Sequence, residues 1–305
     1  MNESTLVIGG SGFIGSALIS SLRDSRIING TSRSTKERES HLGLIKLDLF
    51  DSTNWNEVLK NIQPKTVICT AWETEYREYW NKTTNLAYSK AIEEFAIACF
   101  SNSVEKFVGI GSMSEYGFSP GACMSGVTPL NPQDLYSETK IQTSIAVKKR
   151  AQEFGKNSMW LRLFQPYGPF ENHKRLIPSV IKSLMDNGTA LVNYPSHTLD
   201  FLTVQDTAEA IKFVLGSDTT NEIDIGSGIP MSVEELLRVL ANIMDVDWSD
   251  IHFEEQNRSH ERTIFVDPKS EIFARGWGPL STLQQGLKDY VKWGEENHLN
   301  LRAKN

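Results

Sequence analysis

A glycine-rich turn at residues 9–15, Gly-Gly-Ser-Gly-Phe-Ile-Gly, constrains the fold of this chain more than any other segment. It follows a short apolar run at residues 5–8 and opens a stretch, residues 13–22, whose apolar positions recur every three or four residues. Glycines three apart permit a tight turn and let the backbone approach a pyrophosphate, and the last one lets a helix sit close on a sheet. Strand, turn and helix in this order predict a dinucleotide site at the helix N-terminus; the alternative is a purely structural turn. The residues predicted to contact the cofactor here are Gly9, Ser11, Gly12, Phe13, Ile14 and Gly15.

The first 165 residues alternate short apolar runs with amphipathic stretches. Most of the runs are continuously apolar, which favours strands that helices cover on both faces. Strands are expected at residues 5–8, 27–31, 44–47, 66–70, 107–110 and 159–164. Helices are expected at residues 13–22, 55–62, 79–100 and 135–154. This alternation implies right-handed crossovers and an α/β fold with a doubly wound parallel sheet of the Rossmann type.

The alternation of apolar runs and amphipathic stretches changes after residue 164, where it is interrupted by Gln-Pro-Tyr-Gly-Pro at residues 165–169. Helices are expected at residues 177–185, 207–215, 233–243 and 283–297, and strands at residues 191–194 and 223–225. We therefore expect a dinucleotide-binding domain over residues 1–165. Residues 166–305 should form mainly a smaller α/β substrate-capping region, interleaved with late elements of the first domain.

Composition excludes several classes of protein. The 31 basic and 38 acidic side chains give a formal net charge of −7, which disfavours nucleic-acid or membrane-surface partners. No apolar run approaches the roughly 18 residues that span a bilayer, and the first residues do not resemble a secretory signal. Cys69, Cys99 and Cys123 suggest neither a disulfide framework nor a metal site, and the histidines lack metal-ligand spacing. We expect a cytoplasmic protein with reduced thiols and no metal.

The residues after the second expected strand bear on the choice of cofactor. Thr31, Ser32 and Arg33 stand there without an acid, and Arg33 follows Gly15 by 18 residues (33 − 15), near the motif's usual distance of about 20. An acid at this place would bind the ribose hydroxyls, whereas an arginine favours the 2′-phosphate. The sequence therefore favours NADP(H). The alternative is NAD(H), with Arg33 as a solvated loop charge.

A tyrosine and a lysine four residues apart, Tyr136 and Lys140, open another expected helix. Residues at this spacing share one helix face and can point into one site. A phenol with a pKa of about 10 is a poor base at neutral pH, but a neighbouring ammonium and an oxidised nicotinamide favour the phenolate. The run Gly-Ser-Met-Ser-Glu-Tyr-Gly at residues 111–117 adds Ser112 after the fifth expected strand.

In this order the motifs resemble the extended short-chain dehydrogenase/reductase family of nucleotide-sugar epimerases, dehydratases and reductases. The resemblance covers nearly the whole chain. Beyond the segments already given, it rests on Leu-Asp-Leu at 47–49, Leu-Arg-Leu-Phe-Gln-Pro-Tyr-Gly-Pro at 161–169, Asp-Phe at 200–201, Val-Gln-Asp at 204–206, Ile-Gly-Ser-Gly at 225–228 and Gly-Trp-Gly-Pro at 276–279.

The resemblance implies a role for each catalytic residue. Ser112 would hydrogen-bond the reacting sugar oxygen, Tyr136 would transfer its proton, and Lys140 would hold the cofactor ribose and lower the pKa of the tyrosine. It also implies a homodimer through residues 79–100 and 135–154. Further cofactor contacts are implied at Asp48, Leu49, Ala71, Trp72 and Pro166.

Departures from the family pattern narrow the reaction. The 4,6-dehydratases carry an Asp-Glu pair directly after the catalytic hydroxyl residue, where this chain has Met113 and Ser114, so dehydration is not expected. The usual asparagine before Tyr-Gly-Pro is Gln165, and Leu199 stands where an arginine usually precedes Asp-Phe. Arg258, or else Arg262, is the candidate that clamps the diphosphate. The predicted substrate contacts are Trp72, Met113, Ser114, Gln165, Arg175 and Arg258.

Two groups of residues allow two interpretations each. Trp72, Tyr76, Tyr79 and Trp80 either shape the substrate pocket or pack under the following helix. The acids Glu115 and Glu138 are expected to be exposed, although either could act in the site.

The sequence thus predicts an NADP(H)-dependent oxidoreductase that reduces the 4-keto group of a nucleotide-linked 4-keto-(6-deoxy) sugar, with Tyr136 as proton donor. The alternative within the family is an NAD-dependent nucleotide-sugar 4-epimerase or dehydrogenase. A third hypothesis, a redox sensor or scaffold that binds dinucleotide without turnover, is disfavoured because Tyr136 and Lys140 are both present.

Overall fold

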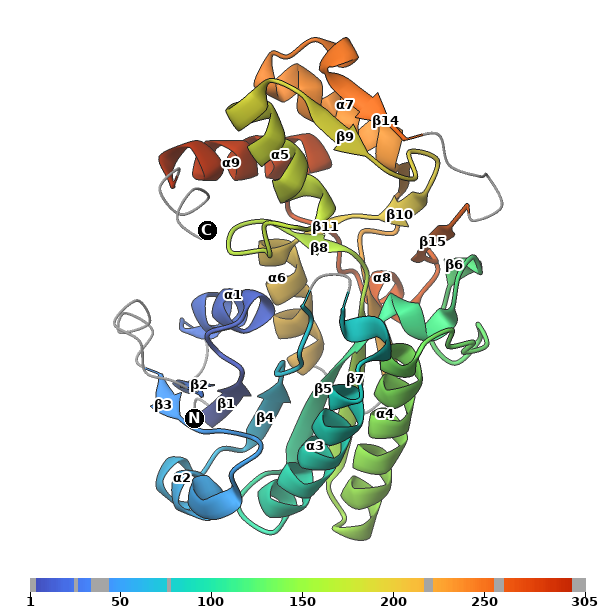
Figure 1. Cartoon of the computed structure of the whole chain (residues 1–305). Helices are drawn as coiled ribbons and strands as arrows, with labels where there is room; N and C mark the ends of the chain where they lie inside the picture. The colour runs from blue at the N-terminus through green and yellow to red at the C-terminus, as the bar shows by residue number, and fades with distance from the viewer. Residues whose placement is uncertain are drawn as a thin grey trace.

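A seven-stranded parallel sheet forms the centre of the computed structural model, which describes residues 4–24, 27–33, 44–75, 78–216, 222–254 and 261–297 (Figure 1). Its strand order is β12-β7-β5-β4-β1-β2-β3. From β1 the chain first builds outward to β2 and β3 and then crosses to β4 on the other side. The crevice where this direction reverses is the place where ligands bind in such sheets. The predicted doubly wound α/β fold is confirmed.

The strands are β1 (Ser4–Ile8), β2 (Ile27–Ser32), β3 (Ile45–Lys46), β4 (Thr66–Cys69), β5 (Lys106–Ser112), β6 (Gly121–Cys123), β7 (Asn157–Leu163), β8 (Pro166–Tyr167), β9 (Ala190–Val192), β10 (Thr198–Asp200), β11 (Leu202–Thr203), β12 (Glu222–Ile225), β13 (Pro230–Ser232), β14 (Ile251–Phe253) and β15 (Thr263–Val266). The helices are α1 (Phe13–Leu22), α2 (Trp55–Ile62), α3 (Thr84–Phe100), α4 (Leu135–Glu153), α5 (Leu176–Asn187), α6 (Val204–Leu215), α7 (Val233–Met244), α8 (Glu271–Ala274) and α9 (Leu283–Glu296).

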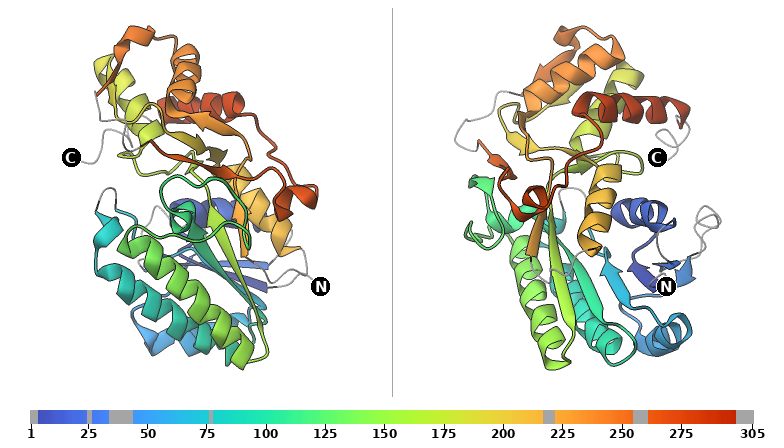
Figure 2. Two further views of the ribbon diagram at one scale, coloured as in Figure 1. Left: turned by 90° about the vertical axis from the view of Figure 1, so that its right-hand side faces the viewer. Right: turned by 180° about the vertical axis from the view of Figure 1, so that it is seen from behind.

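Helices cover both faces of the sheet, as the views in Figure 2 show. Along β1, Leu6 and Ile8 pack with α2 and α3, whereas Val7, between them, packs with α1 and α6. Successive strand residues point to opposite faces, so a strand buried on both faces must be apolar at every position. This explains why the first strands read as continuous apolar runs.

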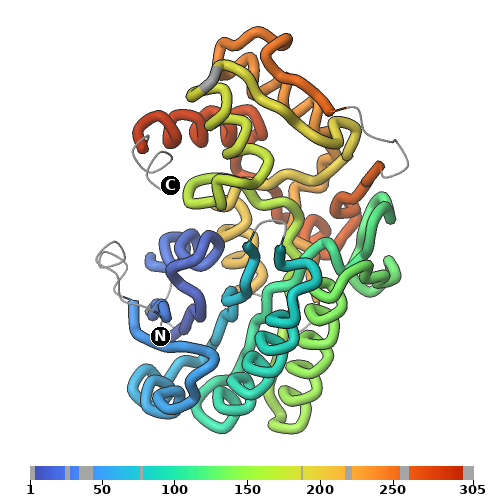
Figure 3. The backbone as a smooth tube through the Cα atoms, viewed as in Figure 1, coloured from blue at the N-terminus to red at the C-terminus, as the bar shows by residue number. Residues whose placement is uncertain are grey.

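The later half of the chain builds a second region around its own apolar core and also completes the first sheet. The helices α5, α7 and α9 pack around Leu236, Leu237 and Leu240 beside the four-stranded sheet β13-β10-β15-β6. Figure 3 shows that α6 returns to lie beside α1, where Ser21 Oγ donates a hydrogen bond to Glu209 Oε1 at 2.7 Å. The strand β12 forms the edge of the main sheet. The boundary at residues 165/166 stays a prediction.

The long amphipathic elements lie close to where the sequence predicts them. The bounds of α1 and α2 agree with the prediction, whereas the stretch 79–100 begins with a separate 3₁₀ turn, Tyr79–Asn81, before α3. The elements that the sequence analysis missed are β6, β8, β10, β11, β13, β14, β15 and α8, which have two to four residues each. Segments this short show no periodicity. Across the described ranges, no helix combines the length and apolar character needed to cross a bilayer.

The strand β5 carries glycines next to the indole ring of a residue on β7, its neighbour in the sheet. Gly109 pairs in register with Trp160 of β7, and a Cβ atom on Gly109 would lie 2.1 Å from Trp160 Cζ3. A Cβ on Gly111 would lie 2.3 Å from Trp160 Nε1. The Trp160 side chain therefore lies flat over β5 only because this strand lacks side chains at both positions.

We predict that Gly109→Ala lowers the free energy of unfolding by about 3 kcal/mol, because the indole must shift inside a packed core. Denaturant unfolding followed by fluorescence measures this loss. Gly278→Ala is the matched control, since a Cβ there meets nothing within 4 Å. Equal effects of the two substitutions would contradict the packing argument.

Candidate active site

The glycine turn brings the backbone of β1 into contact with the start of α1. Gly9 has a φ of +81° and its carbonyl accepts a hydrogen bond from Gly12 N at 2.9 Å. A Cβ on Gly15 would lie 2.2 Å from Gly9 O, so only glycine fits at this contact. Gly12 is the N-cap residue of α1 and supplies no side-chain cap. The first N–H groups of α1 therefore point toward any anion held at the turn, which fits a dinucleotide phosphate.

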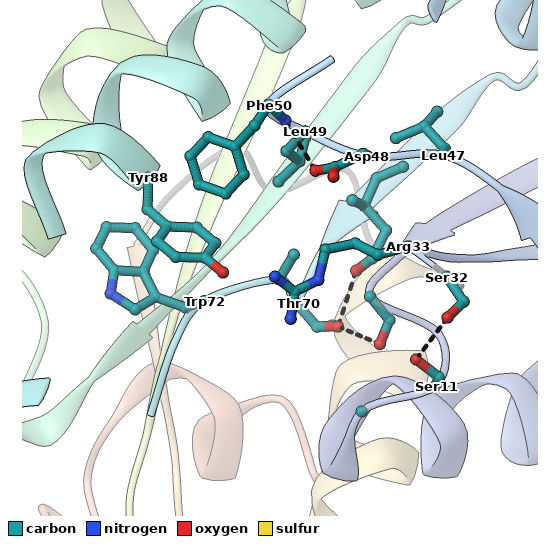
Figure 4. A pocket seen from close by; sticks show the side chains of 14 residues that line it. Ser11, Ser32, Arg33, Leu47, Asp48, Leu49, Phe50, Thr70, Trp72 and Tyr88 are labelled. Carbon is teal, nitrogen blue, oxygen red and sulfur yellow. Dashed lines mark hydrogen bonds between the residues drawn. The ribbon is translucent and has the colours of Figure 1, made fainter. Parts of the chain in front are cut away.

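A cavity of about 170 Å³ lies beside this turn, at the carboxyl ends of β1, β2 and β4 (Figure 4). It contains nine of the predicted cofactor residues: Gly9, Ser11, Gly12, Ser32, Arg33, Asp48, Leu49, Ala71 and Trp72. The other predicted contacts, Phe13, Ile14, Gly15, Thr31, Tyr136, Lys140 and Pro166, do not line it. The cavity thus adjoins the glycine turn and reaches Trp72, whose ring meets that of the predicted catalytic Tyr136.

Five residues that line this cavity were missed by the sequence analysis: Ile8, Leu47, Phe50, Thr70 and Tyr88. Four of them adjoin predicted contacts along the chain, so a wider window would have included them. Tyr88 comes from α3 and meets Phe50 edge-on, with the ring centroids 4.8 Å apart. Only the packing of α3 against the loop after β3 brings these two rings together.

The polar groups of the cavity gather at the end of β2. The hydroxyl groups of Ser11 and Ser32 share a hydrogen bond of 3.1 Å. Figure 4 shows the exposed Arg33 side chain reaching across the cavity toward Thr70. Asp48 lies on the opposite wall, and its Oδ1 accepts a hydrogen bond from Phe50 N at 3.0 Å. Two hydroxyls and a guanidinium therefore face the cavity from this end.

Ser112, at the carboxyl end of β5, is oriented by the 3₁₀ turn Met113–Tyr116 that it caps. Its Oγ accepts hydrogen bonds from Ser114 N at 3.2 Å and from Ser114 Oγ at 2.9 Å. With both lone pairs occupied, the hydroxyl proton of Ser112 remains to be donated. Ser112 also bonds to the hydroxyl of Tyr136, so the structure brings these two predicted catalytic residues together.

Tyr136 lies in an aromatic cage at the start of α4, where it is 7% exposed. The rings of Trp72, Tyr79 and Trp80 all meet its ring edge-on, at centroid distances of 6.1, 4.8 and 5.7 Å. Burial raises the pKa of Tyr136 well above its usual value, Tyr79 adds to the effect, and the bond from Ser112 opposes it. The neutral phenol is therefore the stable form in the ligand-free protein. These three rings contact Tyr136, and Trp72 also packs against α3 through Asn85 and Tyr88, so a role in the substrate pocket stays a prediction; Tyr76 lies outside the described residues.

Lys140 is buried one turn further along α4, with an exposed fraction of 4%. Its Nζ donates a hydrogen bond to Ile110 O at 2.7 Å and lies 3.8 Å from the centre of the Trp72 ring. The indole is fixed in turn by a hydrogen bond of 2.8 Å from its Nε1 to Asn85 Oδ1. Burial lowers the pKa of Lys140 to about 7, and the carboxylate of Glu115 acts in the opposite direction.

The positions that hold the acid pair in the dehydratases carry no carboxylate here. Met113 is buried in the apolar core, and Ser114 is bonded to Ser112. The expectation that Glu115 is exposed was wrong, since its exposed fraction is 0%. Arg162 Nε binds Glu115 at 2.6 Å, and this buried ion pair explains why the acid points inward. Glu138 is exposed, as expected.

On the other side of the site, Gln165 and Arg175 form a polar pair. Arg175 donates a hydrogen bond of 3.4 Å to Gln165 Oε1 and forms an ion pair of 3.2 Å with the buried Glu171. The positive charge of Arg175 also acts to lower the pKa of Tyr136. Arg258 lies outside the described residues. Arg262 has a buried Nε with no hydrogen-bond partner within the described ranges.

Comparison with known proteins identifies the family. A family model described as the NAD dependent epimerase/dehydratase family matches residues 5–226. A dTDP-glucose 4,6-dehydratase from Streptomyces griseus is 26% identical over 198 residues, which span 64% of this chain and 60% of that relative. A dTDP-D-glucose 4,6-dehydratase from Homo sapiens is 24% identical over an alignment of 322 residues, covering 98% of this chain and 92% of the relative.

The solved structures agree with the fold. A point mutant of the UDP-glucuronic acid 4-epimerase from Bacillus cereus, in complex with UDP-4-deoxy-4-fluoro-glucuronic acid and NAD, matches with a TM-score of 0.84 at 20% identity. The match covers 96% of this chain and 99% of that one. Because the family model spans the sheet from β1 to the end of β12, the chain belongs to the NAD dependent epimerase/dehydratase family, the extended short-chain dehydrogenase/reductase enzymes that its motifs resemble.

Proposed function

We propose that this protein is an NADP(H)-dependent reductase of a nucleotide-linked 4-keto-(6-deoxy) sugar. The observation that carries the proposal is the site around Tyr136, in which the serine, tyrosine and lysine converge while Met113 and Ser114 replace the acid pair of the dehydratases. Reduction of a ketone needs one hydride and one proton and no carboxylate for the loss of water. NADPH, when bound, supplies the hydride to the carbonyl carbon.

The protein supplies the proton that the reduction of the ketone needs. A neutral phenol in an apolar cage is suited to give its proton to the developing alkoxide oxygen, and Ser112 would turn its hydroxyl proton from Tyr136 to that oxygen as a hydrogen-bond donor. The oxygen–hydrogen bond of Tyr136 breaks as that of the product alcohol forms. Lys140, as an ammonium, would bind the ribose hydroxyls and stabilise the phenolate that remains.

The cofactor preference rests on the end of β2. Ser11, Ser32 and Arg33 line the cavity, and the sequence at the end of β2, Thr-Ser-Arg at residues 31–33, has no acid at the position that binds ribose hydroxyls in NAD enzymes; the acid that lines the cavity, Asp48, follows β3. The guanidinium presents several donors to a phosphate oxygen, which supports NADP(H). On the substrate side, Gln165, Arg175 and one of Arg258 or Arg262 would contact the diphosphate.

The second candidate is an NAD-dependent 4-epimerase or dehydrogenase. It is favoured by the Bacillus cereus epimerase, whose structure contains NAD and has the same fold. An epimerase returns the hydride to the sugar, so it would retain NAD through purification and interconvert sugars without net consumption of cofactor. Thermal stabilisation by NAD⁺, NADH, NADP⁺ and NADPH, each with UDP, GDP, CDP or dTDP, distinguishes the two candidates and identifies the nucleotide.

A homodimer through α3 and α4 is part of the proposal. These helices pack side by side on one face of the sheet. They leave Leu86 49% and Ile145 62% exposed, which provides apolar surface for a second copy.

We predict that Tyr136→Phe lowers kcat for ketone reduction by about 10³-fold, because the proton donor is lost while the ring and its packing remain. NADPH affinity, measured by fluorescence titration, should stay nearly unchanged. Tyr79→Phe is the control, since it removes a neighbouring hydroxyl of the same cage. Similar turnover in the wild type and in Tyr136→Phe would remove this tyrosine from the mechanism.

We predict that Arg33→Ala weakens NADPH binding by about 10- to 100-fold, the usual cost of a lost charged hydrogen bond, and leaves NADH binding nearly unchanged. Calorimetric titration with both cofactors measures the difference. Lys60→Ala, which removes an exposed cation of α2 away from the cavity, controls for net charge. Equal losses for the two cofactors would make Arg33 a solvated loop charge.

We predict that Lys140→Met changes how the stability of the ligand-free protein depends on pH. The folded lysine has a pKa of about 7 and the unfolded one about 10.5, so between these values the unfolded chain binds more protons. The unfolding free energy of the wild type should therefore rise with pH in this window, by up to about 1.4 kcal/mol per pH unit relative to the variant. Lys148→Met, at an exposed position of the same helix, should retain the rise. A rise that persists in Lys140→Met would show that the lysine is not its source.

A further inference from the structure

Glu115 is a buried charge that the proposed reaction does not use. All the hydrogen-bond partners of its carboxylate are N–H donors. Oε1 accepts from Ser112 N at 2.8 Å and from Trp160 Nε1 at 3.1 Å, and Oε2 accepts from Arg162 Nε at 2.6 Å. Three such donors are best satisfied by the ionised carboxylate. Burial raises the pKa of Glu115, whereas Arg162 and the hydrogen bonds from Ser112 and Trp160 lower it and favour the anion beside the serine of the site.

The backbone of β5 leaves open the space that the Glu115 carboxylate occupies. A Cβ on Gly111 would lie 2.5 Å from Glu115 Oε1, so the carboxylate occupies space that only glycine leaves open. The neighbouring residue, Ile110, gives its carbonyl oxygen to Lys140 Nζ at 2.7 Å. The Trp160 ring also adjoins both groups, since its Nε1 bonds to Glu115 and its centroid lies 5.9 Å from Lys140 Nζ. The anion and the ammonium thus flank one short stretch of β5 and one indole.

Arg162 does not cancel the charge of Glu115 by itself. Its NH2 group binds a second carboxylate, that of Glu222, also at 2.6 Å. Glu222 is 34% exposed, whereas Glu115 and Arg162 are inaccessible to solvent. One buried cation therefore serves two carboxylates, and Lys140 is the next cation toward the site.

The protonation state of Lys140 depends in turn on the carboxylate of Glu115, which is not one of its direct contacts. Its immediate surroundings are the rings of Trp72, Tyr136 and Trp160, which replace water around the ammonium. Other titratable groups face the same region from β4, the 3₁₀ turn before α3, α3 and α4: Cys69, Tyr79, Tyr88 and Tyr136. Burial raises the pKa of Cys69 to about 11 and that of Tyr136 further, so neither is an anion near neutral pH. Glu115 is the group whose charge offsets the burial of the lysine.

We propose that Glu115 is a positioning residue, whose carboxylate fixes the main chain of Ser112 and keeps Lys140 in its ammonium form from beside Trp160. The chemical role assigned to Lys140 rests on the proposed function, but the effect of one charge on the other does not. It can therefore be measured in the ligand-free protein without any substrate.

The experiment is a set of unfolding free energies between pH 5.5 and 9 for the wild type, Glu115→Gln, Lys140→Met and the double variant. The glutamine keeps an oxygen for Ser112 N–H and removes the charge. The difference between proteins with lysine and with methionine at position 140 isolates the titration of the folded lysine, whose midpoint is about 7 in the wild type. In the Glu115→Gln background we expect this midpoint to fall by about one pH unit.

Glu222→Gln is the matched control, because it removes the other carboxylate of Arg162 and should leave the midpoint unchanged. A midpoint that stays near 7 in the Glu115→Gln background, or that falls equally with Glu222→Gln, would overturn the proposal. If the glutamine is not tolerated beside the Arg162 Nε–H, the variant Glu115→Gln/Arg162→Met removes both buried charges. It carries the same expectation, because Glu115 is the charge that acts on the lysine.

A kinetic measurement separates this proposal from the proposed function. In a protein with ketone reductase activity, Glu115→Gln should move the high-pH limb of kcat/KM to lower pH by about the same one unit, whereas a purely structural defect would lower all rates alike. Absence of reductase activity in the wild type would contradict the proposed function. It would leave the measured midpoint, and hence the role of Glu115, standing.

Discussion

The contact between Gly9 and Gly15 is the constraint on which the arrangement of the site depends. Because no side chain separates them, the end of β1 and the first turn of α1 meet at backbone distance. The exposed N–H groups of α1 then point over the carboxyl ends of β2 and β4, where the sheet reverses direction. The loop after β3 and the start of α3 close the cavity over this turn. A side chain at Gly15 would separate the strand from the helix, and one at Gly9 would press on Thr70 and Ala71 at the end of β4.

The part of the site around Tyr136 and Lys140 is lined by aromatic rings, which has two physical effects. Rings exclude water from Tyr136 and Lys140, so both side chains prefer their neutral forms more than they would in solution. Neutral tyrosine is the form that gives a proton, but neutral lysine cannot stabilise the phenolate that is left. The buried carboxylate beside Gly111 shifts this balance toward the ammonium for the lysine, and it favours the neutral phenol of the tyrosine further. The surroundings of the two groups thus differ in polarity: aromatic rings enclose Tyr136 and Lys140, and the Glu115–Arg162 ion pair lies on the other side of the contact with Trp160 Nε1.

Much of the fold and part of the site follow from local sequence patterns. The glycine turn, α1, α2 and the positions of the first strands along the chain were predicted correctly, because each is set by residues near it in the chain. The aromatic wall formed by Phe50 and Tyr88 was not predicted, since it needs two segments that meet only in three dimensions. Glu115 was misjudged for a similar reason. A lone acid in a sequence is usually exposed, and only the distant Arg162 turns this one inward.

The return of the chain to its first sheet has a consequence for how the protein folds. Helix α1 is covered by α6, about 190 positions later in sequence, and β7 gains its outer neighbour only when β12 is present. During synthesis, Leu18 and Leu22 of α1 therefore stay without their packing partners on α6 until much of the chain has been made. Contacts of such long range slow folding and leave apolar surface exposed in the meantime. The two regions of this protein should accordingly reach the native state together, as one cooperative unit.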